Sequence, residues 1–324
     1  MAWRKIALIA CAICLGSSVG HAQKYPDKVI TIVVPFTAGG PTDTVARLVA
    51  QPMSTILKGQ IIIENVGGAG GTIGANRVAK AAPDGYNLLL HHIGQATAPS
   101  LYRKLPYDPV NDFEPIGLIN EVPMTIIARR DFPPKDLKEL IAYLKTNKEK
   151  VTYANAGIGA ASHLCGMLLM SQIEVDLTTV PYKGTADVMK DLLGGQIDFT
   201  CDQTTNTTSQ IKAEKVKVYG VTTKTRLATF PKIPTVDEAG LKGFEVSIWH
   251  ALYAPKGTPK PVIEALTKAL QAALKDKIVK QRFADLGTEP VAEKRATPEA
   301  LRVQLKSEID RWAPIIKKAG VYAD

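Results

Sequence analysis

Apolar and polar positions follow two different periods along most of the chain. Short apolar or alternating stretches predict strands, and longer stretches with apolar residues every three or four positions predict helices. The predicted strands cover residues 29–34, 61–66, 86–92, 115–120, 124–130, 151–156, 177–182, 197–202, 216–222 and 245–255. The predicted helices cover residues 42–57, 72–82, 135–147, 161–173, 184–193, 206–213, 259–275, 277–286 and 297–319. This alternation indicates an α/β protein with mainly parallel sheets flanked by helices.

Two extended stretches interrupt the alternation and suggest crossings between domains. They are NEVPMTIIARR at residues 120–130 and GFEVSIWHALYAP at residues 243–255. If both are hinge strands, domain 1 contains residues 24–123 and 250–324, and domain 2 contains residues 124–249. Two lobes joined by a pair of strands can close on a ligand.

The first 22 residues predict export to the periplasm. Arg4 and Lys5 precede an apolar run, and small residues follow up to Ala22, which is the layout of a cleavable secretory signal peptide. An alternative lipoprotein box at residues 8–11 would leave an apolar region shorter than signal peptides have. No later stretch reaches the roughly 18 apolar residues that a membrane-spanning helix needs.

Charge and cysteine content limit the function classes. The net charge is +9, but the cations are scattered and no basic run is interleaved with aromatic residues, so we expect no nucleic-acid partner. Cys165 and Cys201 remain after cleavage at Ala22. A disulfide and two free buried thiols are both compatible with an exported chain of this size.

The loop PFTAGGPTD, residues 35–43, joins a predicted strand to a predicted helix. Glycines let the backbone approach a ligand, and unpaired amides at a helix start attract an anion. A plain turn is the alternative. The candidate ligand-binding residues here are Phe36, Thr37, Ala38, Gly39, Gly40, Thr42 and Asp43. Asp43 and Arg47 have the spacing of a helix-surface ion pair.

A second loop, NAGIGAASH at residues 155–163, repeats this design in the other predicted domain. Its candidates are Asn155, Gly157, Ala160, Ser162 and His163. For His163, a structural hydrogen-bonding role is the main alternative. Polar residues after strand 197–202 add Asp202 and Gln203, and Gln95 is a further candidate. Lys183 is either an anion partner or a surface cation.

Other kinds of site are poorly supported. The glycines at 68, 70, 71 and 74 do not match a dinucleotide fingerprint. His91 and His92 are adjacent on a strand and therefore point to opposite faces, which does not suit a metal site. We expect no cofactor and no metal. An exported hydrolase using Ser162 or His163 would need a partner residue that the sequence does not reveal.

Several segments, in this order, resemble the substrate-binding proteins of tripartite tricarboxylate transporters, the Bug or TctC-like family. They include YPDKVITIVVPFTAGGPTDTVARLVA, ENVGGAGGTIGANRVAKAAPDGYNLLL and VPYKGTADVMKDLLGGQIDFTCD. The resemblance implies a two-lobed, type II-like periplasmic binding protein fold. It also implies that an anionic ligand, usually a carboxylate, lies between residues 36–43 and 155–163.

From these observations we expect a monomeric extracytoplasmic receptor rather than an enzyme. It would bind a small mono- or dicarboxylate and deliver it to the membrane components of a tripartite tricarboxylate-type transporter. A ligand sensor for a signalling system is the alternative that the sequence cannot separate from transport. The segment after Asp202 is more polar than is typical of the family, so the identity of the carboxylate stays open.

Overall fold

The computed structural model describes residues 25–323. Its strands are β1 (Ile30–Val34), β2 (Ile61–Asn65), β3 (Asn87–His92), β4 (Phe113–Arg129), β5 (Thr152–Asn155), β6 (Thr178–Pro181), β7 (Phe199–Gln203), β8 (Val216–Val221), β9 (Ser247–Pro255) and β10 (Glu289–Pro290). Its helices are α1 (Pro41–Leu57), α2 (Thr72–Ala79), α3 (Gly94–Leu101), α4 (Leu137–Asn147), α5 (Ala161–Ile173), α6 (Thr185–Leu193), α7 (Thr204–Lys212), α8 (Lys260–Lys275), α9 (Lys277–Asp285) and α10 (Pro298–Ala319). Two short 3-10 helices, η1 (Ala69–Gly71) and η2 (Glu293–Arg295), complete the set.

The strands form one continuous hydrogen-bonded path in the order β2-β1-β3-β9-β4-β7-β5-β6, with β8 and β10 also paired to β4. Strands β1, β2 and β3 are parallel to one another, and so are β5, β6 and β7. The long strands β4 and β9 run antiparallel to their neighbours. Each parallel group carries helices in its connections, as the alternating sequence pattern predicts.

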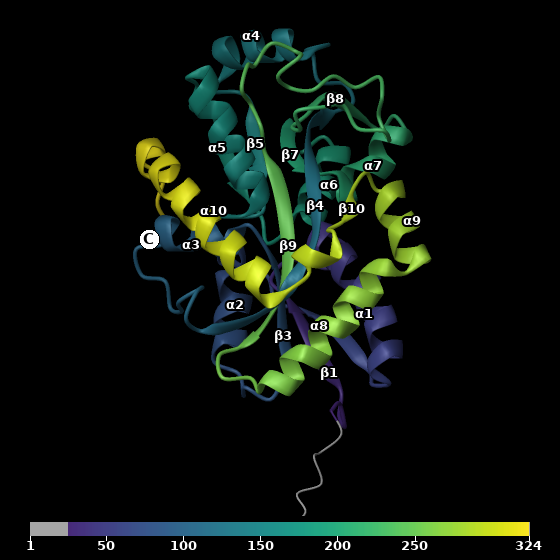
Figure 1. Ribbon diagram of the computed structural model, residues 1–324. Helices are drawn as coiled ribbons and strands as arrows, with labels where there is room; N and C mark the ends of the chain where they lie inside the picture. The colour runs from purple at the N-terminus through teal and green to yellow at the C-terminus, as the bar shows by residue number, and fades with distance from the viewer. Residues whose placement is uncertain (1–24, 324) are drawn as a thin grey trace, which may run out of the picture.

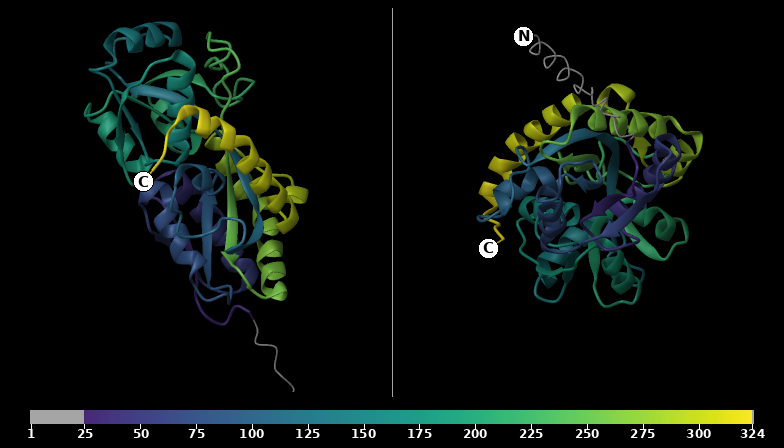
Figure 2. Two further views of the ribbon diagram at one scale, coloured as in Figure 1. Left: turned by 90° about the vertical axis from the view of Figure 1, so that its left-hand side faces the viewer. Right: turned by 90° about the horizontal axis from the view of Figure 1, so that it is seen from below.

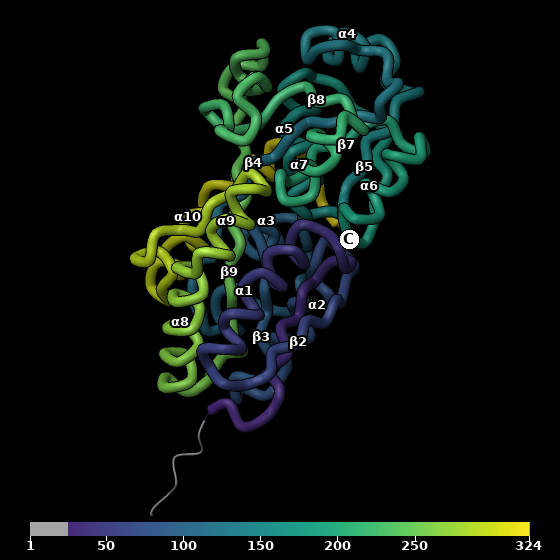
Figure 3. The backbone as a smooth tube through the Cα atoms, turned by 90° about the vertical axis from the view of Figure 1, so that its right-hand side faces the viewer, coloured from purple at the N-terminus to yellow at the C-terminus, as the bar shows by residue number. Residues whose placement is uncertain are grey.

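Strand β4 connects the two halves of the molecule (Figure 1). From Phe113 to Pro123 it pairs with β9, and from Met124 onward it pairs with β7 and β8. We call the half built on β1, β2, β3 and β9 lobe 1 and the half built on β5 to β8 lobe 2. Figure 3 shows the two lobes one above the other, with β4 at their junction and β9 in the lower lobe.

The C-terminal helices all cover lobe 1. Helix α8 packs against α1, and α10 packs against α3 and β4. Figure 2 shows α10 lying along the side of lobe 1, distant in sequence from the purple and blue elements that it covers. Apolar positions of β1, β3 and β9 are buried on both faces of the sheet because helices lie on both sides.

Most predicted elements are present within a few residues of their predicted ends. The predicted strands 115–120 and 124–130 are one continuous strand, β4, because the chain passes straight from one lobe to the other. Helix α3 was missed. Its sequence, GQATAPSL, contains Pro99 and has no apolar period. The helix therefore depends on packing against α10 and not on a helical sequence pattern.

Two predictions concern export and membrane-spanning segments. The predicted signal peptide, residues 1–22, lies outside the described residues. Among residues 25–323, no helix has the length and apolarity needed to cross a membrane.

A disulfide joins Cys165 to Cys201, which answers the question that the sequence left open. Cys165 lies on α5 and Cys201 on β7, and both are fully buried. The two Cα atoms are 6.1 Å apart, within the usual range for such a bond. The disulfide therefore ties a helix of lobe 2 to a neighbouring strand.

Candidate functional site

A narrow cavity lies between the lobes, where the loops after β1 and β5 face each other. Lobe 1 contributes Phe36, Pro41, Thr42 and His92 to its wall. Lobe 2 contributes Ala156, Ala160, Ala161, Ser162, Thr185, Asp202 and Gln203. Every one of these residues is buried. The free space between these walls is about 10 Å³, room for about one water molecule, so the lobes must move apart to admit a ligand that both then contact.

The lobe 1 side of the cavity contains the start of helix α1. Gly40 is the N-cap with an extended backbone, and Pro41 occupies the first helical position. Proline suits that position because it has no N–H to leave unpaired. The amides of the first turn have no acceptor inside a helix and carry partial positive charge. The backbone N–H groups of Thr42 and Asp43 are therefore suited to an anion.

The Asp43 side chain stabilises the first loop and does not line the cavity. Its carboxylate accepts hydrogen bonds from the Gly39 amide at 2.9 Å, from Arg47 Nε at 2.8 Å and from Asn65 Nδ2 at 3.0 Å. Burial raises the pKa of Asp43, but these hydrogen bonds outweigh it and hold the pKa below its usual value. The predicted Asp43–Arg47 pair is present.

The lobe 2 side of the cavity contains the start of helix α5. Ser162 Oγ accepts a hydrogen bond from the Ala156 amide at 2.9 Å, and Asn155 Oδ1 accepts one from the Gly157 amide at 2.8 Å. These bonds fold the loop back toward the helix. The first amides of α5, including those of Ala161 and Ser162, have no acceptor within the helix. They add a second set of anion-attracting N–H groups.

His163 stabilises its own loop. Its Nδ1 accepts a hydrogen bond from the Gly159 amide at 3.3 Å. Burial lowers the pKa of His163 to about 4, so the ring is neutral near pH 7. This arrangement matches the structural alternative stated for His163, and the residue is absent from the cavity wall.

Four amides that we expected to face the ligand donate inside the protein instead. They are the amides of Gly39, Gly40, Gly157 and Ala160, and their acceptors are Asp43 Oδ2, Thr37 O, Asn155 Oδ1 and Gly157 O. The prediction placed the free donors one turn too early. Loop amides are used to form the turn, whereas the helix amides that follow have no local acceptor.

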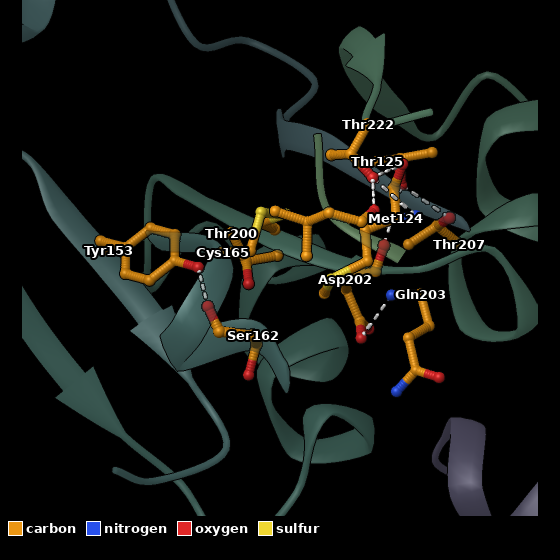
Figure 4. The surroundings of a disulfide bond; sticks show 12 residues. Met124, Thr125, Tyr153, Ser162, Cys165, Thr200, Asp202, Gln203, Thr207 and Thr222 are labelled. Atoms are coloured by element: carbon orange, nitrogen blue, oxygen red, sulfur yellow. Dashed lines mark hydrogen bonds between the residues drawn. A yellow bond between two sulfur atoms is a disulfide. The ribbon is translucent and has the colours of Figure 1, made fainter. Parts of the chain in front are cut away.

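Asp202 places a buried carboxylate at the cavity. It lies near the end of β7, is 1% exposed, and accepts hydrogen bonds from the Gln203 amide at 2.8 Å and from Asn206 Nδ2 at 2.5 Å. Burial raises the pKa of Asp202 to about 6 despite these bonds. Figure 4 shows Ser162 and Asp202 close to the disulfide, which joins the elements that carry them.

Three predicted side chains carry buried polar atoms without a hydrogen-bond partner among residues 25–323. These atoms are Thr37 Oγ1, both amide atoms of Gln95 and Gln203 Oε1. Gln203 lines the cavity, whereas Gln95 is buried on α3 and Thr37 lies against Gly184 of lobe 2. Buried polar groups normally have a partner. These atoms are therefore available to a ligand or to water.

His92 is a cavity residue that sequence analysis missed. Its ring stacks on Phe36 with ring centroids 4.6 Å apart. Burial lowers the pKa of His92 to about 3, so the ring is neutral near pH 7. The signal that could have identified His92 was its place at the carboxyl end of β3, beside β1, because ligands of parallel sheets bind at that edge.

Among residues 25–323, no group of three or more His, Cys, Asp or Glu side chains is arranged to hold a metal ion.

The structure divides the predicted site residues into two groups. Those in the cavity wall are Phe36, Thr42, Ala160, Ser162, Asp202 and Gln203. Those outside it are Thr37, Ala38, Gly39, Gly40, Asp43, Gln95, Asn155, Gly157 and His163. The wall residues that the sequence did not predict are Pro41, His92, Ala156, Ala161 and Thr185. Pro41, Ala161 and Thr185 each begin a helix after a strand, which is the common signal.

Solved structures of similar sequence share this fold. The periplasmic binding protein BugD is 56% identical, with a TM-score of 0.91, and the match covers 93% of this chain and 100% of BugD. MatC from Rhodopseudomonas palustris, solved with bound malate, is 41% identical, with a TM-score of 0.88 and coverage of 90% and 100%. Rpa4515 from R. palustris, solved with adipate, is 32% identical, with a TM-score of 0.87 and coverage of 92% and 99%.

These matches confirm the predicted two-lobed periplasmic binding protein fold. A family model described as the tripartite tricarboxylate transporter family receptor matches residues 45–321. This range includes the second loop, most of α1 and all the C-terminal helices. The chain therefore belongs to the tripartite tricarboxylate transporter receptor family, whose members are periplasmic solute-binding proteins.

Proposed function

We propose that this protein is an exported, monomeric receptor that binds a small mono- or dicarboxylate between its lobes. It then delivers the ligand to the membrane components of a tripartite tricarboxylate-type transporter. Export relies on the predicted signal peptide at residues 1–22.

The observation that carries this proposal is the meeting of two helix starts at one buried cavity. Helix α1 comes from lobe 1 and helix α5 from lobe 2, and residues of both first turns line the wall. Each start favours negative charge through its unpaired amides and its dipole. A carboxylate therefore favours the arrangement in which both lobes contact it.

The ligands of related proteins support a small carboxylate as the ligand class. The solved relatives hold malate and adipate, which are both small dicarboxylates. Their similarity to this chain extends over nearly the whole fold. We take the shared chemistry, a short chain with carboxylate ends, as the expected ligand class here.

The proposed contacts are sufficient for useful affinity. Micromolar binding requires about −8 kcal/mol. Hydrogen bonds to charged groups contribute roughly 1.5–3 kcal/mol each, so a few such bonds from the Ser162 hydroxyl and the unpaired amides of the two helix starts supply that amount. Phe36 and His92 exclude water from one side of the ligand. Asp202 and Gln203 contact the rest of the ligand and distinguish between carboxylates.

We also propose that the lobes move as two bodies, residues 24–123 with 250–324 and residues 124–249. Support comes from strand β4, which pairs with β9 up to Pro123 and with β7 from Met124 onward. On the return path, the Val246 amide donates to the Thr222 carbonyl at 3.0 Å just before β9 begins. Rotation about these two crossings would open the cavity.

A thermal-shift screen of the mature protein tests the ligand class. Short dicarboxylates should raise the melting temperature because they bind only the folded state, whereas the uncharged diamides of the same chain length should not. Ala156→Leu fills the cavity wall and should remove the shift. Ala272→Leu, on the exposed face of α8, should retain it. A screen in which no carboxylate raises the melting temperature would contradict the proposal.

A further inference from the structure

A buried row of hydrogen bonds leads from strand β4 to the ligand cavity. Thr288 Oγ1 lies 2.5 Å from the Glu121 carbonyl oxygen and 3.3 Å from Asn120 Nδ2. Asn120 Oδ1 lies 3.0 Å from His250 Nδ1, and His250 Nε2 lies 3.3 Å from Thr42 Oγ1. The four side chains are at most 3% exposed. Water therefore does not compete for these bonds.

The direction of the first two bonds follows from donor chemistry. A carbonyl oxygen only accepts, so the single hydroxyl proton of Thr288 is donated to the Glu121 carbonyl. Thr288 Oγ1 must then accept from Asn120, which places the NH2 group of the Asn120 amide on the Thr288 side. Its oxygen, Oδ1, therefore faces His250.

The tautomer of His250 follows from the same reasoning. An amide oxygen only accepts, so His250 Nδ1 carries a proton and donates it to Asn120. Burial, together with the neighbouring His92, lowers the pKa of His250 well below its ordinary value, so the ring is neutral near pH 7. The other ring nitrogen, Nε2, therefore has a lone pair and no proton.

This tautomer fixes the role of Thr42. Because Nε2 can only accept, the hydroxyl of Thr42 donates its proton to His250. After donating its proton, Thr42 Oγ1 has only lone pairs left and can accept a hydrogen bond. Thr42 lines the cavity. The side chain thus offers an acceptor to a ligand, while the helix amides beside it offer donors.

A second acceptor faces the same cavity from the opposite lobe. Asp202 lines the wall, and its two bonds, from the Gln203 amide and Asn206, leave further lone pairs on the carboxylate. Acceptors on both sides suit an O–H or N–H group on the ligand. A ligand without such a group would leave buried acceptors unpaired, which is unfavourable.

We propose that the row Thr288, Asn120 and His250 fixes the Thr42 hydroxyl as a hydrogen-bond acceptor and so makes the receptor select carboxylates that also carry a hydroxyl or ammonium donor. This inference rests on the proposed function and adds a selection rule to it. Asn120 and His250 act here as positioning residues, since they reach the ligand only through Thr42.

Calorimetry with three matched ligands tests the selection. Succinate, L-malate and L-aspartate share one four-carbon dicarboxylate skeleton and differ in a hydrogen, a hydroxyl or an ammonium group on one carbon. We expect malate or aspartate to bind about tenfold or more tightly than succinate. The comparison of malate with aspartate then identifies which donor the cavity takes.

Two variants test the row itself. Thr42→Val keeps the side-chain shape but removes one of the two acceptors, so the preference over succinate should fall severalfold and retain only the part that Asp202 supports. Asn120→Leu frees the His250 tautomer and should reduce the same ratio. The matched control is Thr267→Val, which removes a buried hydroxyl bonded to the Ile116 carbonyl. General destabilisation would weaken all ligands together and leave the ratio unchanged.

Nitrogen-15 NMR of labelled histidine gives a readout independent of ligand. His250, assigned by loss of its signals in His250→Gln, should show a protonated Nδ1 and an unprotonated Nε2. A protonated Nε2 would overturn the inference. So would equal affinity for the three ligands, or binding only of carboxylates without a donor, such as adipate, and the proposed function would stand in both cases. If no carboxylate binds, both proposals fail.

Discussion

Gly70 of lobe 1 lies directly against the carbonyl oxygen of Ile158 in lobe 2. A Cβ atom on Gly70 would lie 1.8 Å from that oxygen, and the residue has a positive φ of 61°. Tyr102 Oη lies within hydrogen-bond distance of the same carbonyl, at 2.8 Å, and of the Ala69 carbonyl, at 2.6 Å. The glycine-rich segment that follows β2 therefore forms part of the contact between the lobes.

This contact predicts that Gly70→Ala prevents full closure. The added methyl group has no space unless the lobes separate, so ligand affinity should fall at least tenfold while each lobe still folds. Calorimetry with the carboxylate identified by thermal shift measures the effect. Gly195→Ala is a matched control, because Gly195 also has a positive φ, 72°, but nothing within 4 Å of the added Cβ. Equal losses in both variants would indicate backbone strain alone.

The three hydrogen bonds of Asp43 predict a large loss of stability in Asp43→Ala. Removing the carboxylate leaves the Gly39 amide without its acceptor and removes one of the two hydrogen bonds that Asn65 Nδ2 donates, the other of which goes to the Phe36 carbonyl. Hydrogen bonds to charged groups stabilise by roughly 1.5–3 kcal/mol, so we expect unfolding free energy to fall by about 2–4 kcal/mol. Urea denaturation measures this change. Asp187→Ala, at an exposed position in the first turn of α6, should change stability by less than about 0.5 kcal/mol.

The raised pKa of Asp202 predicts that the free energy of unfolding depends on pH. The pKa is about 6 in the folded state against an ordinary value of 3.8 for an aspartate side chain. Between these values the folded state holds a proton that the unfolded state has released. The stabilising effect of this proton is therefore complete below pH 3.8 and is lost as pH rises through 6.

Asp202→Asn mimics the protonated side chain at every pH. Relative to the unmodified protein without ligand, it should gain about 2 kcal/mol of stability between pH 4.5 and pH 7.5, which is the part of the effect of the pKa shift that falls in this range. Melting curves at the two pH values measure the gain. Asp176→Asn, at an exposed position, should show no such gain. A constant difference between Asp202→Asn and the unmodified protein would show that Asp202 does not titrate in this range.

The disulfide predicts a link between oxidation state and ligand binding. Cys165 follows Ser162 by three residues on α5, and Cys201 precedes Asp202 on β7, so the bond holds two parts of the cavity wall together. Replacing both cysteines with alanine should lower stability by about 3 kcal/mol, within the usual range of 2–4 kcal/mol.

Denaturation and calorimetry on the oxidised protein and on the Cys165→Ala, Cys201→Ala double variant measure both effects. Affinity should fall together with stability, because α5 and β7 are then held only by packing. A reducing agent should affect the unmodified protein and leave the double variant unchanged. Unchanged affinity in the double variant would mean that packing alone sets the cavity wall.

The sequence alone determined the α/β class, most element positions and the two loops that border the cavity. These features depend on local chemistry: apolar period, glycine turns and helix starts are readable within about ten residues. The long-range resemblance then gave the family and the two-lobed fold. Helix α3 and the continuity of β4 escaped prediction because they depend on packing and on where the chain crosses between lobes.

The tertiary structure decided which groups face the ligand cavity. In both loops the sequence offered more donors than a cavity can use, and only the fold shows that the amides of Gly39 and Gly157 are taken by Asp43 and Asn155. It also brought together Thr42 and His250, which are 208 residues apart in sequence. Each N–H group donates to one acceptor. Which acceptor lies within reach depends on the neighbours that the folded chain places beside it.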